Sequence, residues 1–347
     1  MERRELLLKH GAWMQEDESS PVVLSSRVRL ARNLEDFPFP HALSSERALQ
    51  TETTLAQALT GVSIADTGLT YLSLSDLTTV EQQVLIEKHL ISPALVNSEG
   101  PRGVALTEDH RVAAMVNEED HLRLQVILPG SRLGDTLRLV NALDDALEQN
   151  LEFAYREAHG YLTACPTNVG TGMRASVMVH LPALAMVNQV QQVLGALTHI
   201  GLAVRGLYGE GSQAYGHILQ VSNQITLGKS EEDIITHLEA VTGQIVEHEL
   251  QARERLRQQA RLALEDKVWR ARGTLQHARL LTSEEALNLL SFDRLGTDMG
   301  ILPKPRTTFV TLLVDSNPGC LQYISNYELD AAQRDEQRAK LVRAAYA

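Results

Sequence analysis

Cysteine is scarce in this chain, and long apolar runs and an excess of basic residues are missing. Cys165 and Cys320 are the only cysteines among 347 residues, too few for a disulfide framework or, alone, for a four-ligand zinc site. No run of about 18 apolar residues is present, and residues 1–5 mix acids with bases and precede no apolar core of a signal peptide. The net charge of −12, with a pI near 5.5, argues against direct nucleic-acid binding. We therefore expect a soluble, cytoplasmic protein that has no membrane partner.

The apolar pattern predicts an α+β protein with two main domains. An apolar period near 3.6 predicts helices over 44–60, 77–91, 133–158 and 183–199. Alternating or continuous apolar runs predict strands over 22–30, 112–116, 122–128, 175–181, 201–208 and 217–222. From Ser230 the pattern is helical almost to the end, with breaks expected at Gly273 and Gly296. The predicted parts are a lead-in over 1–21, an antiparallel-sheet domain flanked by helices over 22–252, and an all-helical domain over 253–347.

An acidic turn, Asn117-Glu118-Glu119-Asp120-His121, separates the two runs of the predicted hairpin. A guanidinium group has a pKa above 12 and a planar fork of donors, so it attacks phosphorus only when a carboxylate aligns the fork and accepts a proton. Glu118 and Glu119 are placed for that task. Glu210, in a glycine-flanked segment, is a candidate for a second carboxylate from elsewhere. Taken alone, an acidic turn is more often plain solvated charge.

The known nucleotide loops are missing, but a set of separated arginines is present. Gly228-Lys229-Ser230 imitates the end of a Walker loop, yet Asn223 stands where its first glycine belongs. The motifs of the ordinary protein kinases are absent. Phosphoryl transfer instead needs positioning and charge stabilisation around the phosphates, and arginine binds phosphate bidentately. The candidates are Arg27, Arg29, Arg123, Arg174 and Arg205. For any one of them, the alternative is a weak surface ion pair.

In this order and spacing, the segments resemble the ATP:guanidino phosphotransferases (phosphagen kinases). The resemblance covers about residues 22–252 and implies ATP with Mg²⁺ as cofactors. It implies that Glu119 and Glu210 hold the guanidino group, with Glu118 beside them, and that the five arginines contact the phosphates. It adds His89 as a nucleotide contact, and nucleotide-binding segments made of Ser25, Ser26, Arg27, Val28 and Arg29, of Arg174, Ala175, Ser176, Val177 and Met178, and of Arg205, Gly206, Leu207, Tyr208, Gly209 and Glu210.

Cys165 precedes a glycine-rich turn in Thr163-Ala164-Cys165-Pro166-Thr167-Asn168. A free cysteine is most often a buried small hydrophobe. Its hydroxyl neighbours, and the arginines expected nearby, favour a thiolate that matches the reactive cysteine of the family. We expect this thiolate to tune substrate alignment without forming a covalent intermediate. Cys320 has no comparable setting and is expected to be structural.

Two departures point to the branch of the family that acts on proteins, the bacterial protein arginine kinases. Metabolite guanidino kinases place a helical domain with a substrate-closing loop before the first arginine motif, whereas 26 residues precede Arg27 here. The second departure is the C-terminal helical region, whose Arg334-Asp335-Glu336-Gln337-Arg338-Ala339 matches the phosphoarginine-binding motif of that branch. Arg334 and Arg338, at i and i+4 of one helix, could both hold a phosphate, with Asp335 pairing the guanidinium. Alone, this pattern would be a solvated helix face.

The resemblance implies a set of partners and leaves alternatives open. The substrates would be unfolded proteins and a heat-shock repressor, phosphoarginine would direct proteins to a Clp-type protease, and a zinc-binding protein would activate the enzyme. An allosteric ligand made by the enzyme itself suggests a homodimer or a larger assembly. The enzymatic alternative is a metabolite guanidino kinase, and the non-enzymatic one is a phosphoarginine-binding adaptor, which would have no need of a catalytic base.

Overall fold

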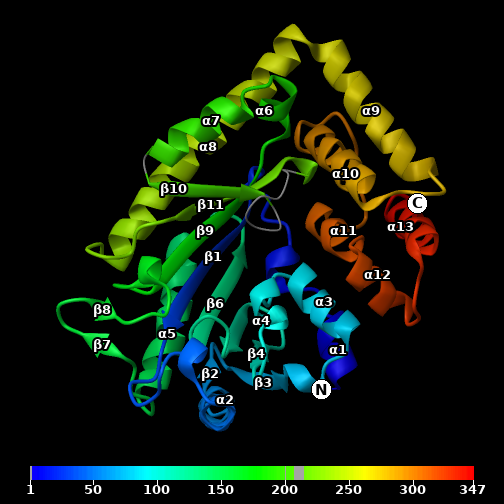
Figure 1. Cartoon of the computed structure of the whole chain (residues 1–347). Coiled ribbons are helices and arrows are strands. Elements are labelled where there is room, and N and C mark those ends of the chain that lie inside the picture. The colour runs from blue at the N-terminus through cyan, green and yellow to red at the C-terminus, as the bar shows by residue number, and fades with distance from the viewer. Residues whose placement is uncertain (1, 200, 207–214) are drawn as a thin grey trace.

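A large antiparallel sheet organises the chain in the computed structural model, which describes residues 2–199, 201–206 and 215–347 (Figure 1). Within these residues the strand order is β10 (Leu202–Gly206), β11 (Ile218–Asn223), β9 (Met173–His180), β1 (Val23–Arg32), β6 (Leu122–Pro129), β5 (Val112–Val116), β4 (Gly103–Thr107), β3 (Thr67–Ser73) and β2 (Ser63–Ile64). A separate small hairpin joins β7 (Tyr155–Arg156) to β8 (Gly160–Tyr161). The structure therefore confirms the predicted α+β class and the antiparallel sheet.

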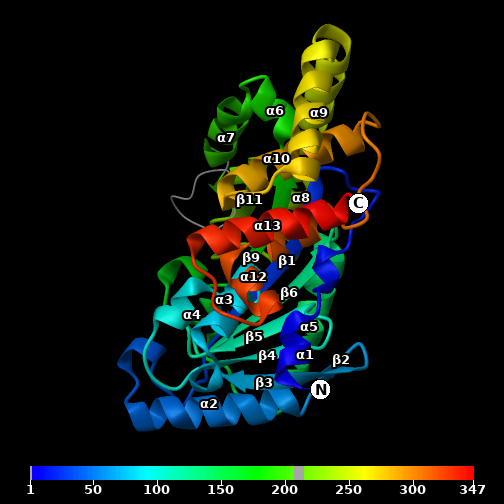
Figure 2. The same cartoon turned by 90° about the vertical axis from the view of Figure 1, so that its right-hand side faces the viewer.

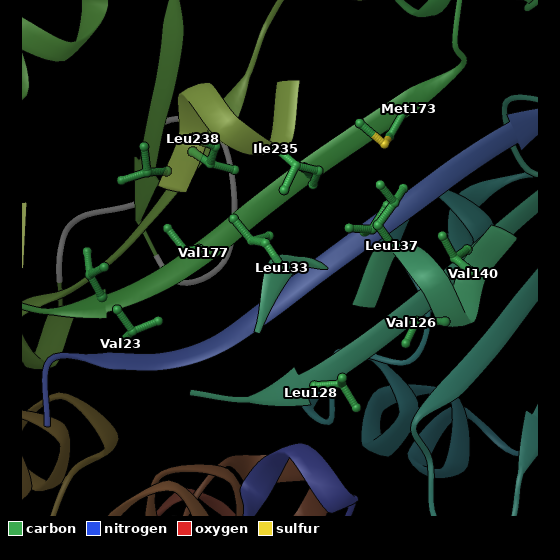
Figure 3. Close-up of a cluster of buried hydrophobic side chains, with 14 of the residues drawn as sticks. Val23, Val126, Leu128, Leu133, Leu137, Val140, Met173, Val177, Ile235 and Leu238 are labelled. Carbon is green, nitrogen blue, oxygen red and sulfur yellow. The ribbon is translucent and has the colours of Figure 1, made fainter. Parts of the chain in front are cut away.

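One face of the sheet packs against a first group of helices. These are α2 (Ser45–Thr60), α5 (Leu133–Glu148), α6 (Pro182–Met186), α7 (Val190–His199) and α8 (Glu231–Gln259). Figure 3 shows how Leu133, Leu137 and Val140 of α5 lie over Val126 of β6 and Val177 of β9. Because alternate residues of a strand point to opposite faces, this apolar layer fixes which residues face the other side.

The other face is covered by a second group of helices, most of them from the C-terminal part. They are α1 (Arg3–Leu8), α3 (Thr79–Glu87), α4 (Pro93–Asn97), α10 (Ser283–Asp298), α11 (Phe309–Asp315), α12 (Pro318–Ser325) and α13 (Ala331–Ala345), and α9 (Arg261–His277) contributes Leu275. Figure 2 shows α12 and α13 in front of the sheet. Among the described residues, no helix combines the length and the apolarity that crossing a bilayer needs.

Several predicted elements are confirmed by their capping residues. The side chain of Ser44 accepts from Arg47 N at the start of α2, and Ser230 and Asp233 form a reciprocal capping box at the start of α8. The hairpin of β5 and β6 pairs Val116 with Leu122, as predicted. α8 runs through the predicted domain boundary at 252 as far as Gln259. The division of the chain into domains stays a prediction.

Three predictions about helices are wrong. The helix expected over 133–158 ends at Glu148, because the backbone that follows pairs with the segment after β1: Ala154 N donates to Asn33 O at 2.7 Å. The helix expected over 183–199 divides into α6 and α7 around Asn188, whose φ is +55°. Gly273 and Gly296 do not break helices. A Cβ on Gly296 would lie 2.6 Å from Leu302, so this glycine permits close packing instead.

Candidate active site

A cleft of about 640 Å³ opens on the second face of the sheet, beyond the area that the helices cover. Ile127 of β6 and Met178 of β9 face the C-terminal helices. Arg123 of β6 and Arg174 of β9 lie on the same face of the sheet, where this face opens into the cleft. The described residues that line the cleft are Arg29, Ala31, Ala94, Ser98, Glu118, Glu119, Arg123, Cys165, Thr167, Asn168, Gly172, Arg174 and Arg205. One face of the sheet is thus apolar at one end and cationic at the other.

Strand register brings the predicted arginines together. Arg29 of β1 lies directly opposite Arg174 of β9, and Arg27 lies opposite Ser176. Arg123 of β6 stands opposite Ala31 of β1. Since residues two apart on a strand share a face, Arg27 and Arg29 join Arg123 and Arg174 in one group, which we call the arginine cage. Arg205 of β10 reaches the same cleft.

Like charges lie close together in the arginine cage. Burial, followed by Arg174 and Arg123, lowers the pKa of Arg27 to about 10. Burial, followed by Arg27, Arg123 and Arg174, lowers the pKa of Arg29 well below its usual value, although Glu118 opposes this shift. Within the described residues neither Arg27 nor Arg29 has an ion pair, and Arg29 Nε has no hydrogen-bond partner. Because an arginine keeps its charge, this site favours a polyanion.

Neutral side chains orient parts of the arginine cage. Arg27 Nη2 donates to the Gln220 side chain at 2.8 Å, and Arg174 Nη2 donates to Ser222 Oγ at 3.2 Å. Both acceptors come from β11, and neither was predicted from the sequence. Their positions in β11 could have indicated this role. Ile218 is buried in the core on the second face and Leu219 in the core on the first. Gln220 and Ser222 alternate with Leu219, so they lie on the face of Ile218, which is the side of the cleft.

The acidic turn holds one carboxylate rigidly and leaves the next one open. The Glu118 side chain is 2% exposed, accepts from Ser92 Oγ at 2.6 Å, and lies 2.6 Å from Arg123 Nη1. The Glu119 side chain is 44% exposed, and its Oε2 lies 2.8 Å from Arg123 Nη2. Arg123 therefore shows that the two carboxylates can hold a guanidinium fork between them. Glu119 is the one that an incoming substrate can reach.

Asp120 fixes the acidic turn to the loop that carries Cys165. It is fully buried, and its Oδ1 accepts from Asn33 Nδ2 and from Ala164 N, both at 2.7 Å. Burial raises the pKa of this carboxyl, and these two hydrogen bonds oppose the shift. No role for Asp120 was predicted from the sequence. Its position inside the acidic motif was the only available signal.

Cys165 lines the cleft, and Cys320 does not. Cys165 is partly exposed, and its Sγ lies 3.0 Å from Thr167 Oγ1 in a 3-10 turn over Pro166–Asn168. Cys320 is buried in α12, where burial and Glu87 raise the pKa of the thiol well above its usual value. The thiolate state of Cys165 stays a prediction. The Cys165 side chain lines the same cleft as the carboxylates and the arginines.

His89 lies behind the arginine cage, one residue past the C-cap of α3. Its ring packs edge-on against Trp13 with centroids 5.4 Å apart, and its carbonyl accepts from Gln125 Nε2 at 2.8 Å. Burial and the charge of Arg27 lower its pKa to about 3, so the imidazole is neutral. His89 is not among the described residues that line the cleft, and its contact with a nucleotide stays a prediction.

The other predicted nucleotide residues divide between the two faces. Ser26 Oγ donates to Gly130 O and accepts from Arg132 N, and Ser25 is also buried. Val28, Ala175 and Val177 belong to the core on the first face and Met178 to the core on the second, so these residues hold their strands in place. Ser176 faces Arg27, whose Nε lies 3.4 Å from its Oγ. Gly206 ends β10. The predicted residues Leu207, Tyr208, Gly209 and Glu210 lie outside the described residues.

The C-terminal motif lies on α13, away from the cleft. Arg338 is fully buried: its Nε donates to Ser316 O, and its Nη1 donates to Leu281 O and to Asp335 Oδ1, each at 2.7 Å. Ala339 is buried beside it. Arg334 Nη1 donates to Leu329 O at 2.8 Å, Glu336 is exposed, and Gln337 lies 3.4 Å from the Tyr327 hydroxyl. In this conformation Arg338 supports the fold, and phosphate binding by this pair stays a prediction.

Comparisons with known proteins agree with this geometry. The family model "ATP:guanido phosphotransferase, C-terminal catalytic domain" matches residues 50–252. Among solved structures, lombricine kinase has a TM-score of 0.59 at 27% identity over 71% of this chain and 70% of its own. The duplicated taurocyamine kinase of Schistosoma mansoni, with bound transition-state analogue components, has a TM-score of 0.59 at 27% identity over 65% of this chain and 32% of its own. The chain belongs to the ATP:guanido phosphotransferase family.

Further matches define the branch within that family. Residues 261–347 match the family model "Protein-arginine kinase McsB C-terminal domain". A protein-arginine kinase of Moorella thermoacetica is 49% identical over 97% of both chains, and one of Symbiobacterium thermophilum is 48% identical over 96% of this chain and 95% of its own. The chain is thus a member of the protein-arginine kinase branch, as the sequence motifs predicted.

Proposed function

We propose that this protein transfers the γ-phosphoryl group of ATP to arginine side chains of other proteins. The observation that carries the proposal is the juxtaposition of the arginine cage with an exposed carboxylate at Glu119, whose neighbour Glu118 is buried and fixed. A cationic pocket for phosphates thus adjoins an anionic one for a guanidinium. Full-length similarity to proteins named protein-arginine kinase supports the choice of substrate.

The proposed mechanism is an in-line attack of a guanidino nitrogen on the γ-phosphorus. Glu119 aligns the fork and accepts the proton that the attacking nitrogen loses, while Glu118 holds the turn. The N–P bond forms as the bond between the γ-phosphorus and the bridging oxygen breaks, so ADP leaves with the electron pair. The arginine cage stabilises charge on the phosphoryl oxygens, and Cys165 and the predicted Glu210 align the substrate.

Mg²⁺ fits this site through the nucleotide. Among the described residues, no cluster of three or more His, Cys, Asp or Glu side chains could hold a metal ion, and the carboxylates that line the cleft are Glu118 and Glu119. Mg²⁺ binds hard oxygen ligands, so the phosphates would hold it. It would neutralise charge on the phosphates and favour their productive geometry.

The biological setting follows from the family branch. Substrates would be unfolded proteins and a heat-shock repressor in the cytoplasm, so transfer would mark proteins for a Clp-type protease during stress and relieve repression. A zinc-binding protein would activate the enzyme. Phosphoarginine bound at Arg334 and Arg338 would regulate it allosterically, within a homodimer or a larger assembly. For Arg338 to take part, it would have to give up acceptors that it now holds at 2.7 Å.

The test is incubation with ATP, Mg²⁺ and an unfolded arginine-rich protein, followed by mass spectrometry at neutral or basic pH. The pH matters because a phosphate bound to nitrogen is labile in acid. We expect phosphate on arginine side chains, and Glu119→Gln should remove it because the carboxylate base is lost. Glu157→Gln, at an exposed turn, is the matched control.

The outcomes separate the alternatives. Turnover of free guanidines without any protein product would indicate a metabolite kinase. Binding of phosphoarginine without any transfer, even with an added activator, would indicate an adaptor. A fully active Glu119→Gln enzyme would contradict the proposed base.

A further inference from the structure

A second hollow, of about 480 Å³, adjoins the cleft at the acidic turn. The two hollows share Ser98, Glu118 and Glu119 in their walls. The second one then extends away from the arginine cage toward Leu43 and Pro101. The Glu118–Glu119 pair therefore stands between two spaces, and the substrate guanidinium has to lie at their junction.

The two hollows differ in charge. Arg29, Arg123, Arg174 and Arg205 line the cleft. The second hollow has no arginine or lysine among the described residues that line it, and its formal charges are the carboxylates of Glu99, Glu118 and Glu119. We call it the acidic hollow. Phosphates are favoured on one side of the acidic turn, and a cationic chain is favoured on the other.

Asn117 fixes the walls of the acidic hollow to the catalytic turn. This residue is 8% exposed and has φ of +54°, which is uncommon outside glycine but tolerated by asparagine. Its Nδ2 donates to Ala48 O in α2 at 2.9 Å and to Pro101 O at 2.8 Å. Both acceptors belong to residues that line the hollow. The space is therefore preorganised around the turn that carries the proposed base.

The acidic hollow also offers apolar contact. Leu43 and Pro40 line it from the segment before α2, and Ala48, Pro101 and Ala164 complete its apolar wall. The Glu118–Glu119 pair alone suffices for a guanidinium fork, as the contacts of Arg123 show. A mixed apolar and acidic space next to it gives further contacts only to a substrate that extends beyond its guanidinium.

We infer that the acidic hollow binds the stretch of extended polypeptide next to the target arginine. The inference rests on the proposed function and specifies its substrate surface. The γ-phosphoryl group approaches from the arginine cage, so an in-line nucleophile must bring its remaining atoms from the opposite side of Glu119. Glu99 favours a cationic neighbour of the target arginine, and Leu43 contacts its aliphatic atoms.

The test compares an unstructured peptide containing one arginine with arginine blocked at both ends by acetyl and methylamide groups. Glu99→Lys should raise the KM for the peptide about tenfold, and Leu43→Ala should raise it several-fold, through lost charge attraction and lost apolar contact. The maximal rate and the KM for ATP should change little. The preference for peptide over blocked arginine, measured as a ratio of kcat/KM values, should fall. Glu254→Lys, an exposed charge reversal on α8, is the matched control.

A photo-cross-link provides a second measurement that does not require turnover of blocked arginine. Benzoylphenylalanine placed at position 43 should label the peptide, and excess unlabelled peptide should suppress this labelling. The same group at Gln57, an exposed residue of α2 outside the hollow, should not label it. An unchanged peptide KM in Glu99→Lys and Leu43→Ala, or no specific labelling from position 43, would overturn the inference. If these variants still make phosphoarginine normally, the proposed function stands without it. If no protein is phosphorylated by the native enzyme, the proposed function itself fails.

Discussion

Arg29 of the arginine cage and Arg338 of α13 lie in opposite environments. Arg338 is fully buried and donates to two carbonyl oxygens and one carboxylate, each at 2.7 Å. Arg29 lies among like charges, and its Nε has no hydrogen-bond partner among the described residues. The same residue type thus supports the fold at one place and destabilises it at the other.

The difference indicates where a ligand belongs. Burying a charge among like charges costs free energy that a bound anion can offset, so the setting of Arg29 favours an anionic ligand. The arginine cage is complementary to a triphosphate, whereas the Arg338 site is already complete. The like charges around Arg29 therefore favour an anion, and the assignment of the cage to the nucleotide stays a prediction.

The largest effect that tests this comparison is expected from Arg29→Met. Removing one preorganised charge from the phosphate site should lower kcat by ~100-fold or more. The folded protein should be as stable as before or more stable, because repulsion from Arg27 and Arg174 decreases. Phosphoarginine formation and urea unfolding measure the two quantities. Near-normal transfer, or a large loss of stability, would show that Arg29 is structural.

The converse change is Arg338→Met. It leaves Ser316 O, Leu281 O and the Asp335 carboxylate without their donor, and breaking such a buried set typically costs ~3 kcal/mol. Urea unfolding should show this loss. Arg334→Met is the matched control on the same helix, with one carbonyl bond to lose and an expected cost of ~1 kcal/mol. If the two substitutions lower the unfolding free energy equally, Arg338 contributes no more to the fold than Arg334, and Arg338 does not differ from the cage in the way proposed.

The same comparison shows what the sequence can and cannot predict. Arg27 and Arg29 were predicted in one strand, where residues two apart share a face, and the acidic turn lies between β5 and β6 as the predicted hairpin required. The sequence could not show that Arg338 is enclosed, because its acceptors Ser316 and Leu281 are 22 and 57 residues away. The β11 partners of the cage, and the role of Asp120 in holding Ala164, likewise depend on tertiary register.

Helix ends were predictable where a local cap sets them and unpredictable where distant packing does. Ser44 and Ser230 carry their own capping side chains. Beyond the end of α5 at Glu148, Leu151 and Ala154 continue the apolar period, yet Phe153 bridges to Leu34 of the segment after β1. Gly296 was expected to break the helix but lies within α10. Its lack of a side chain leaves space for Leu302 and Val268 to pack against the helix.

A smaller effect is expected at Glu87, which connects the two arginine environments. Its buried carboxylate accepts from Gly319 N at 2.9 Å and from Cys320 N at 2.8 Å, at the start of α12. Arg338 binds Ser316 O just before the same helix, and His89 follows Glu87 by two residues. Glu87→Gln should weaken the hold of α12 on α3 by ~1 kcal/mol, enough to raise the KM for ATP about fivefold with kcat nearly unchanged.

Glu81→Gln is the control for Glu87, because it lies at the other end of α3 in a capping box with Thr78. Both substitutions should lower the unfolding free energy slightly. Only Glu87→Gln should alter the KM for ATP. If the KM for ATP is unchanged in Glu87→Gln while the unfolding free energy falls, Glu87 does not affect ATP binding through His89.

The smallest effect concerns groups that stay neutral where the arginines stay charged. Ser291 of α10 lies 2.8 Å from both His180 Nε2 and His217 Nδ1, joining the sheet to the C-terminal helices. One hydroxyl proton can serve only one ring, which must be neutral to accept it, while the other ring donates its own N–H to the hydroxyl oxygen. Burial and Lys267 lower the pKa of His217 to about 4, and burial, followed by Arg253 and Arg294, lowers that of His180 well below its usual value.

The sign of the pH dependence follows from these shifts. Below about pH 6.5 the unfolded chain binds protons at these histidines while the folded protein does not, so the unfolding free energy decreases as the pH falls from 6.5 to 4. Each neutral histidine contributes a slope of ~1 kcal/mol per pH unit in that window. His217→Gln removes one such group, so its urea midpoint should fall less steeply than that of the native protein. His159→Gln, at an exposed turn, should keep the native slope. A native slope in His217→Gln would mean that this ring titrates in the folded state, and Ser291 would then not require it to be neutral.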